Sequence, residues 1–289
     1  MKKKLSLIIF ISAFLLQLSC SEDLNDDPNT GRLSVQLTDA PFPYDLISEA
    51  NVTIFKIDAR HKGNGMEDEE NNKEEGNPFV VLMEEEIDVN LINLTNGNTE
   101  MLADIDVPVG SYDLVRVYVK GVNVVLNDGS TFDLKVPSGE QTGIKVFIKP
   151  SLVVSGEISS DLLLDFDVSR SFIPKGNRKS LAGINGFNFK PVIKASNISF
   201  AGTLAGLVST TQNEEKIGLE GATVSVFAAD TLNTSTFTDE TGNYMILGLM
   251  EGPYDVMVEL EGYETQTAEE VTIMAGNKII QDFDLVPVP

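Results

Sequence analysis

From Arg32 onward, apolar and polar residues alternate in short runs, and this pattern constrains the fold more than any other feature of the chain. Leu33, Val35 and Leu37 are separated by polar residues, and Val115–Val119 repeats the pattern. A period of two residues is typical of strands with one buried face. Turn residues break the runs about every ten positions, and no long stretch has the period of an amphipathic helix. The pattern predicts an all-β fold of antiparallel β-sandwiches.

Two turns can be placed closely. The run Val122–Leu126 is followed by Asn127-Asp128-Gly129-Ser130 and then by Thr131–Val136, which predicts a β-hairpin around an Asp-Gly turn. Thr238–Gly242 predicts a second tight turn, in which Gly242 takes a positive φ.

The first twenty residues, MKKKLSLIIFISAFLLQLSC, have the order of an export signal. Lys2–Lys4 form a positive segment, and Leu5–Leu16 form an apolar one. Twelve residues rise about 18 Å as a helix, which is short of the roughly 30 Å hydrocarbon core of a membrane. The segment therefore predicts an export signal and not a membrane span. For the lipoprotein signal described next, the alternatives are an ordinary secretory signal with an incidental cysteine and an uncleaved anchor.

Leu18-Ser19-Cys20 closes this segment and resembles the lipobox of bacterial lipoproteins. The resemblance implies a signal peptide at residues 1–19, cleavage before Cys20 and acylation (palmitate) of Cys20, which then holds the chain on a membrane. Residues 20–30 are polar and predict a flexible tether. Glu22 and Asp23 resemble the signal that sends some lipoproteins to the outer face of the outer membrane. The implied location is the bacterial cell envelope, as an outer membrane lipoprotein on the cell surface.

Charge and composition exclude several classes of function. The chain has 21 Lys and Arg against 44 Asp and Glu, a formal net charge of −23, so nucleic acid is not expected as a partner. Cys20 is the only cysteine and His61 the only histidine. Thiol chemistry and a multi-histidine zinc site are therefore excluded. We expect no metal site and no cofactor, and we place His61 in a solvated loop. The charged run Lys62–Asn77 predicts a mobile loop, with a binding element as the alternative.

Four segments carry a resemblance to a family of bacterial lipoprotein domains without an established function. They are Leu33–Pro41 (LSVQLTDAP), Pro137–Lys145 (PSGEQTGIK), Leu162–Ser171 (LLLDFDVSRS) and Phe189–Lys194 (FKPVIK). The resemblance implies a β-sandwich domain at residues 31–198 and assigns no catalytic residue.

A second set of motifs lies in residues 199–289. It comprises Gly206-Leu-Val208, Leu219-x-Gly221-Ala222-x-Val224, Thr238-Asp239-x-x-Gly242-x-Tyr244, Gly248-Leu249, Gly252-x-Tyr254-x-Val256 and Gly262-Tyr263. These motifs resemble the carboxypeptidase regulatory-like domain, a seven-stranded transthyretin-like sandwich. The resemblance implies a structural or binding module, of a fold class grouped with carbohydrate-binding sandwiches. The junction at Ile198–Thr203 has no Pro- or Ser-rich linker, so we expect a restricted orientation between the two domains.

Asp165-Phe166-Asp167 is the most pointed candidate site. Alternation places both carboxylates on one face of a strand, about 7 Å apart, opposite the apolar face. That spacing falls in the range of an inverting glycosidase, but side chains two positions apart on one strand point in parallel rather than toward each other. We expect ion pairs with basic neighbours such as Arg170, Arg116 or Lys145, with cation binding as the alternative and catalysis as a remote one.

Sugar-binding sites usually stack a ring on an exposed aromatic side chain, and this chain has no Trp. Five of its tyrosines are predicted to pack inside the sandwiches: Tyr112, Tyr118, Tyr244, Tyr254 and Tyr263. Tyr44 is the best candidate for an exposed tyrosine, although packing is the favoured interpretation there too. The sequence therefore predicts a lipid-anchored surface protein with a non-enzymatic role in binding, adhesion or assembly and a glycan or protein partner. The alternatives are a carbohydrate-binding accessory lipoprotein and, remotely, an enzyme that uses paired carboxylates.

Overall fold

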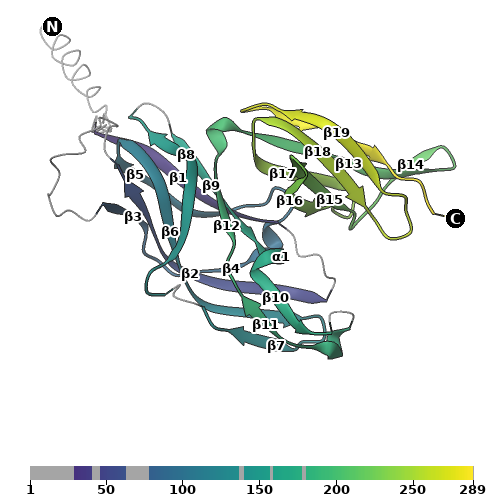
Figure 1. The fold of residues 1–289 in the computed structure, drawn as a ribbon, viewed down its shortest axis with the longest axis horizontal. Coiled ribbons are helices and arrows are strands. Elements are labelled where there is room, and N and C mark those ends of the chain that lie inside the picture. Colours follow the sequence, from purple (N-terminus) through teal and green to yellow (C-terminus); the bar gives the residue numbers. More distant parts are fainter. Residues whose placement is uncertain are drawn as a thin grey trace, which may run out of the picture.

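The computed structural model describes residues 29–40, 46–62, 78–136, 140–156, 159–177 and 180–288. The signal segment with Cys20, Tyr44 and all of the 62–77 loop except Lys62 lie outside the described residues. The described chain is built from strands, and its one α-helix, α1, has four residues. The all-β fold is therefore confirmed (Figure 1). In the described part of the chain, no helix has the length and apolar character needed to cross a membrane.

The first domain contains the strands that precede residue 198. Their bounds are β1 Thr30–Ala40, β2 Ile47–His61, β3 Phe79–Met83, β4 Ile87–Asn90, β5 Glu100–Pro108, β6 Gly110–Leu126, β7 Thr131–Leu134, β8 Ile144–Val154, β9 Ser160–Asp167, β10 Phe172–Gly176, β11 Ile184–Phe189 and β12 Ile193–Asn197. Short helical turns lie at η1 Leu91–Leu94, α1 Val168–Ser171, η2 Leu181–Gly183 and η3 Ile198–Phe200.

Most of these strands form one sheet in the order β3-β2-β6-β8-β12-β9-β1-β5, with β4 and β7 added to β2 and β6. The sheet rolls over on itself, so that its end strands β3 and β5 lie near each other (Figure 1). One apolar core fills the inside of the roll. The alternation of apolar and polar residues produces this core, because successive side chains of a strand point to opposite faces. β6, for example, buries every second residue over much of its length.

Two pairings in this sheet differ from the antiparallel expectation. β1 runs parallel to β9 over eight residue pairs, and β12 runs parallel to β8. β1 and β9 are separated by most of the domain, so no tight turn fixes their relative direction. The remaining pairings of this sheet are antiparallel, including the predicted hairpin, in which Val122 pairs with Leu134 and Gly129 has a φ of 84°.

The second domain contains two facing sheets around a separate core. One sheet has the order β14-β13-β17, with β20 and β21 also on β13, and the other has the order β16-β15-β18-β19. β20 and β21 run parallel to β13, which also differs from the antiparallel prediction. The strands are β13 Ala201–Gln212, β14 Glu215–Gly218, β15 Thr223–Ala228, β16 Thr231–Phe237, β17 Asn243–Met250, β18 Gly252–Glu259, β19 Gln266–Ile273, β20 Lys278–Ile280 and β21 Phe283–Asp284.

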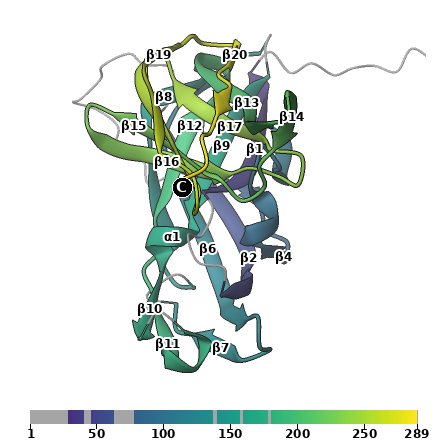
Figure 2. The same ribbon diagram turned by 90° about the vertical axis from the view of Figure 1, so that its right-hand side faces the viewer.

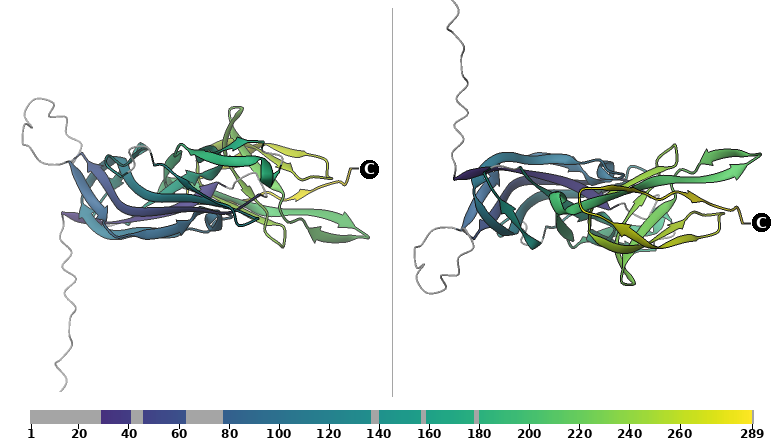
Figure 3. Two further views of the ribbon diagram at one scale, coloured as in Figure 1. Left: turned by 90° about the horizontal axis from the view of Figure 1, so that it is seen from below. Right: turned by 90° about the horizontal axis from the view of Figure 1, so that it is seen from above.

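The two domains are joined with almost no linker. β12 ends at Asn197, the turn η3 follows, and β13 begins at Ala201. Figures 1 and 3 show the second domain at one end of the elongated molecule and the beginning of β1 at the other. In Figure 2 the second domain lies over one side of the first, and the β10–β11 hairpin extends away from it.

Candidate functional site

The two faces of β9 have different neighbours. Leu162, Leu164 and Phe166 point into the core of the first domain. Leu163 is also fully buried but belongs to neither core. It faces β17 of the second domain, where a Cβ built on Gly248 would come 2.8 Å from Leu163 Cδ2. The second face of β9 is therefore covered by the second domain.

Asp165 lies on this covered face, opposite Lys194 on the neighbouring strand β12. Its Oδ1 is buried and has no hydrogen-bond partner. Burial raises the pKa of Asp165 to about 6, although the charge of Lys194 opposes the shift. Burial also lowers the pKa of Lys194, whose ammonium group donates to the carbonyl of Asn233 in the second domain. This pair joins the first domain to β16.

Asp167 has a different set of partners. It is the N-cap of α1, and its Oδ1 accepts hydrogen bonds from the backbone N–H of Arg170 at 2.9 Å and the Ser169 hydroxyl at 2.7 Å. Its Oδ2 lies 2.6 Å from Nε of Arg170. Asp167 therefore stabilises a helical turn, while Asp165 faces the second domain. The two carboxylates do not form a facing pair with a bond-cleaving geometry. Arg116 pairs with Asp58 instead.

A third carboxylate, Asp39, was missed by the sequence analysis. It lies at the end of β1, opposite Phe166 in the register of β9, and only 6% of its surface is exposed. Its Oδ1 accepts the backbone N–H of Val168 at 3.0 Å, while its Oδ2 has no partner. Burial raises its pKa well above the usual value for an aspartate. The sequence did contain a sign of this burial. Asp39 continues the every-second-residue pattern of Leu33, Val35 and Leu37, so it was expected on the same buried face of the strand.

These residues surround a small cavity of about 20 Å³ between the domains. Its wall contains residues of both: Thr38, Asp39, Asn96, Gly97 and Asp165 from the first, and Thr234, Ser235, Thr236, Met245, Ile246 and Leu247 from the second. Four of the buried side-chain oxygens without a partner belong to this wall: Asp39 Oδ2, Asn96 Oδ1, Asp165 Oδ1 and Thr236 Oγ1. No three His, Cys, Asp or Glu side chains of the described residues are placed to hold a metal ion together.

An open groove of about 430 Å³ lies beside the cavity, again between the domains. Its floor includes Phe147, whose side chain is 56% exposed, and the Lys149 ammonium lies 5.9 Å from the centre of that ring. Lys145 and Lys194 also line the groove. In the described part of the chain, neither Lys145 nor Lys149 forms a salt bridge.

The prediction for His61 was wrong. His61 is the last residue of β2 and pairs with Tyr112 in the register of β6. Its Nε2 lies 3.0 Å from the carbonyl oxygen of Val109, and its ring lies 5.2 Å from that of Tyr112. The residues after His61 are rich in glycine, so the sequence predicted a loop that already includes His61. The loop begins later, because β2 and β6 remain paired as far as His61.

The tyrosine predictions are confirmed for the sandwich interiors. Tyr112, Tyr118, Tyr244 and Tyr254 are buried, and Tyr263 packs against the second core. Tyr254 donates to the carbonyl of Met250 at 3.0 Å, which ties β18 to the end of β17. The exposed aromatic rings of the described residues are instead Phe147 and Phe200.

Several solved structures share a weak similarity with the chain. A proposed carbohydrate binding protein from Bacteroides uniformis is 19% identical with a TM-score of 0.26, and the match covers 29% of this chain and 41% of that one. GBS52, the minor pilin of Streptococcus agalactiae, is 13% identical with a TM-score of 0.28, covering 89% and 96%. The shaft pilin SpaA of Lactobacillus rhamnosus GG is 10% identical with a TM-score of 0.27, covering 90% and 98%. A TM-score below 0.5 does not establish a shared fold, so these matches carry no functional argument.

Sequence families give a firmer result. No curated protein matches the chain. The carboxypeptidase regulatory-like domain matches residues 203–286, the part that forms the two facing sheets. The domain of unknown function DUF4382 matches residues 30–191, more than half of the chain and nearly all of the rolled sheet. The chain is therefore a member of the DUF4382 family that also carries a carboxypeptidase regulatory-like domain.

Proposed function

We propose that this chain is a lipid-anchored protein of the bacterial cell surface that binds an anionic partner without chemical turnover. The observation that carries the proposal is the interdomain groove, where exposed Phe147 lies between Lys145 and Lys149. In a chain of net charge −23, this groove brings two lysines, neither with a salt bridge among the described residues, next to an exposed ring. Lysines attract carboxylate or sulfate groups, and the ring offers an apolar face to the rest of the ligand.

The distribution of charge supports binding at this groove. Residues 203–286 contain fifteen acidic residues and only two lysines, Lys216 and Lys278. The second domain therefore repels anions over most of its surface, while the groove at its base attracts them. An acidic oligosaccharide, such as one containing uronic acids, combines the charge that the lysines attract with an apolar sugar face for Phe147.

The non-enzymatic part of the proposal is supported by the carboxylates. Asp165 faces Lys194, and Asp167 pairs with Arg170, so each of the predicted acids already has a cationic neighbour. The groove itself is lined by lysines, small residues and apolar residues, and no carboxylate lies in its wall. Such a lining can hold a ligand and offers no acid for general acid–base chemistry.

The anchor follows from the signal segment and Cys20 and is supported by the placement of the domains. β1 starts at Thr30, close in sequence to the proposed lipid, and its eleven residues rise roughly 35 Å to reach the interdomain cavity. The second domain lies beyond that point (Figure 3). A chain held at Cys20 would therefore carry its groove and second domain away from the membrane.

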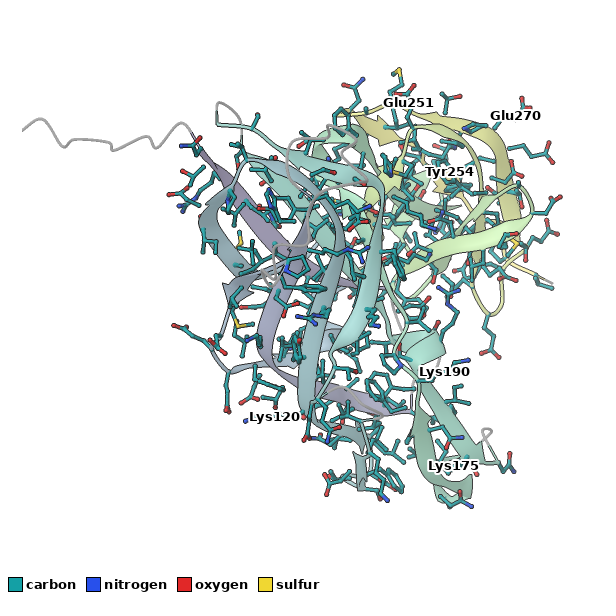
Figure 4. All side chains as sticks on the ribbon, turned by 60° about the vertical axis from the view of Figure 1, so that its left-hand side comes forward. Lys120, Lys175, Lys190, Glu251, Tyr254 and Glu270 are labelled. Atoms are coloured by element: carbon teal, nitrogen blue, oxygen red, sulfur yellow. The ribbon has the colours of Figure 1, made fainter. Side chains whose placement is uncertain are left out.

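Binding is tested with the acyl-free protein, residues 21–289, on an array of neutral and acidic glycans. We expect binding to acidic glycans, and we expect Lys145→Ala with Lys149→Ala to remove most of it. Lys175→Ala is the matched control, because Lys175 is an exposed lysine on β10 (Figure 4) and does not line the groove. Equal losses in the control, or no retention of acidic glycans at all, would show that this groove is not an anion site.

A carbohydrate-binding role for neutral sugars is the second candidate, and the exposed ring of Phe147 favours it. The same array separates the two. If neutral glycans bind, Phe147→Ala should abolish binding and the lysine variants should leave it largely intact. For an acidic ligand, both sets of variants should weaken binding, and raising the salt concentration should weaken it further.

The lipid anchor is tested separately by Cys20→Ser. We expect this variant to appear in the soluble fraction or to remain unprocessed, because there is no thiol to acylate. A second lipid-dependent readout is metabolic labelling with an alkyne-bearing fatty acid, which should mark the wild-type chain alone. A variant that stays in the membrane after signal cleavage would contradict the anchor.

A further inference from the structure

The small cavity between the domains has more unpaired acceptors than the surrounding protein can satisfy. Asp39 Oδ2, Asn96 Oδ1 and Asp165 Oδ1 are buried in its wall without a hydrogen-bond partner, and so is the hydroxyl of Thr236. Asp39 and Thr236 are each more than nine-tenths buried. A buried polar oxygen without a partner costs roughly 1–3 kcal/mol, and a buried charge costs more. Four such oxygens in one wall therefore indicate a bound group that contacts them together.

The orientation of Asn96 is fixed by its own amide nitrogen. Its Nδ2 donates to the carbonyl oxygen of Asn243 at 3.3 Å, and its side chain also hydrogen-bonds with Asp239. Both of these partners are acceptors, so the NH₂ group must face them. The carbonyl oxygen Oδ1 is therefore the atom that faces the cavity.

A single water molecule fits the volume but brings no positive charge. A cavity of about 20 Å³ has room for one water-sized group. Two carboxylate oxygens and one amide oxygen can only accept, whereas a water molecule has two protons to donate. One water together with the Thr236 hydroxyl can satisfy these three acceptors by hydrogen bonds, but it leaves the negative charge of Asp39 without a counter-ion. A metal cation attracts all four oxygens at once.

Local charge leads to the same conclusion. The carboxylates near the cavity are Asp39, Asp165 and Asp167, and the cations near them are Lys194 and Arg170. Arg170 is engaged by Asp167, and Lys194 faces Asp165 from β12. One negative charge, that of Asp39, is left without a partner in the interior.

We propose that this cavity binds one hard metal cation, Ca²⁺ or Na⁺, through Asp39, Asp165, Asn96 and Thr236. The donor set is all oxygen, which suits these ions and excludes the soft metals that prefer thiolate or imidazole. Mg²⁺ is disfavoured because it demands near-ideal octahedral geometry and gives up its water reluctantly. The site uses Asp39 and not Asp167, and Thr236 comes from the second domain. The ion therefore joins the domains as well as neutralising Asp39.

The test uses residues 21–289, stripped with EDTA at pH 7.5 and exchanged into choline chloride. Thermal unfolding is followed after adding CaCl₂, NaCl or MgCl₂ at matched ionic strength, and native mass spectrometry counts the ions retained. We expect one ion per chain and a rise in Tm of several degrees with Ca²⁺ or Na⁺, and the arm that responds identifies the ion. MgCl₂ should give no rise in Tm above the value measured in choline chloride.

Asp39→Asn should lose the response, because it removes the uncompensated charge. Glu270→Gln is the matched control, since Glu270 is an exposed carboxylate on β19 (Figure 4) and should leave the response unchanged. If Asp39→Asn fails to fold, Thr236→Val is the second variant, because it keeps the shape and the charges of the site and removes one oxygen ligand. It should weaken the affinity for the ion about tenfold. No ion retained and no cation-dependent Tm, as for a cavity that holds only water and a protonated Asp39, would overturn the proposal. An equal response in Asp39→Asn and the control would do the same.

Discussion

Arg116 and Asp58 form a two-pronged ion pair across β2 and β6, with Nε of Arg116 2.6 Å from Oδ1 of Asp58 and a terminal nitrogen 2.5 Å from Oδ2. The Asp58 side chain is only 3% exposed. Tyr118 donates its hydroxyl to the same carboxylate at 3.2 Å, and the guanidinium lies 3.5 Å from the centre of the Phe79 ring. The pair therefore holds β2, β3 and β6 together outside the apolar core.

We expect Asp58→Ala to lower the free energy of unfolding of the first domain by about 3 kcal/mol, because it leaves the largely buried Arg116 without its anion. Urea unfolding followed by circular dichroism measures the change. Arg32→Ala is the matched control, since its pair with Asp104 is half exposed and its loss should cost much less. Similar costs for the two variants would mean that burial does not set the strength of these pairs.

Gly242 should tolerate no side chain. Its φ is 82°, and a Cβ there would come 2.5 Å from the carbonyl oxygen of Val208. Gly242→Ala should therefore cost about 3 kcal/mol or more, the sum of roughly 1 kcal/mol for the backbone and the displacement of Val208. Gly221→Ala is the control, because Gly221 has a φ of 74° and open space around its Cβ position. It should cost only about 1 kcal/mol.

Calorimetry of these glycine variants also tests the division of the chain. The two domains have separate cores, so the unfolding transition of the second should move down while that of the first stays in place. A joint shift of both transitions would show that the domains unfold as one cooperative unit.

Docking of the domains should depend on Leu163, which is buried but belongs to neither core. We expect Leu163→Asp to release the second domain, because it places a charge on the apolar contact with β17, while both cores stay folded. Small-angle scattering should show a narrow distribution of sizes for the wild type and a broader one for the variant. Leu164→Ala is the comparison, since Leu164 lies in the first core and should destabilise that domain instead. Broad scattering from the wild type would contradict a fixed orientation.

Stability in chelator should fall as the pH rises through the folded pKa of Asp165, about 6. A raised acid pKa means that the folded state binds more protons than the unfolded state between about pH 4 and 6, so stability is greatest at the acid side of this window. Asp39 has a pKa raised by burial as well and acts in the same direction. Asp165→Asn should flatten the dependence between about pH 4 and 6. Melting temperatures across this range measure it, and an unchanged slope in the variant would contradict the assignment.

The fold class followed from alternation because a half-buried strand leaves its period in the sequence whatever it pairs with. The hairpin at Asn127–Ser130 and the positive φ of Gly242 could be predicted because they are local, set by glycine within a few residues. The end of β2 at His61 was missed, since a long partner strand, β6, extends it into a segment with loop composition. The parallel pairing of β1 with β9 was also missed, because only the whole sheet decides it.

The candidate site divides in the same way. The sequence by itself determined that Leu163 and Asp165 share one face of a strand and that Leu164 and Phe166 share the other. It could not determine that a second domain covers the first of these faces, because nothing in a strand's own pattern records what packs on it. Only the tertiary structure brings Asp39 beside Asp165 and buries an unpaired oxygen of each, and that burial, rather than the residue types, makes the interdomain cavity a candidate site.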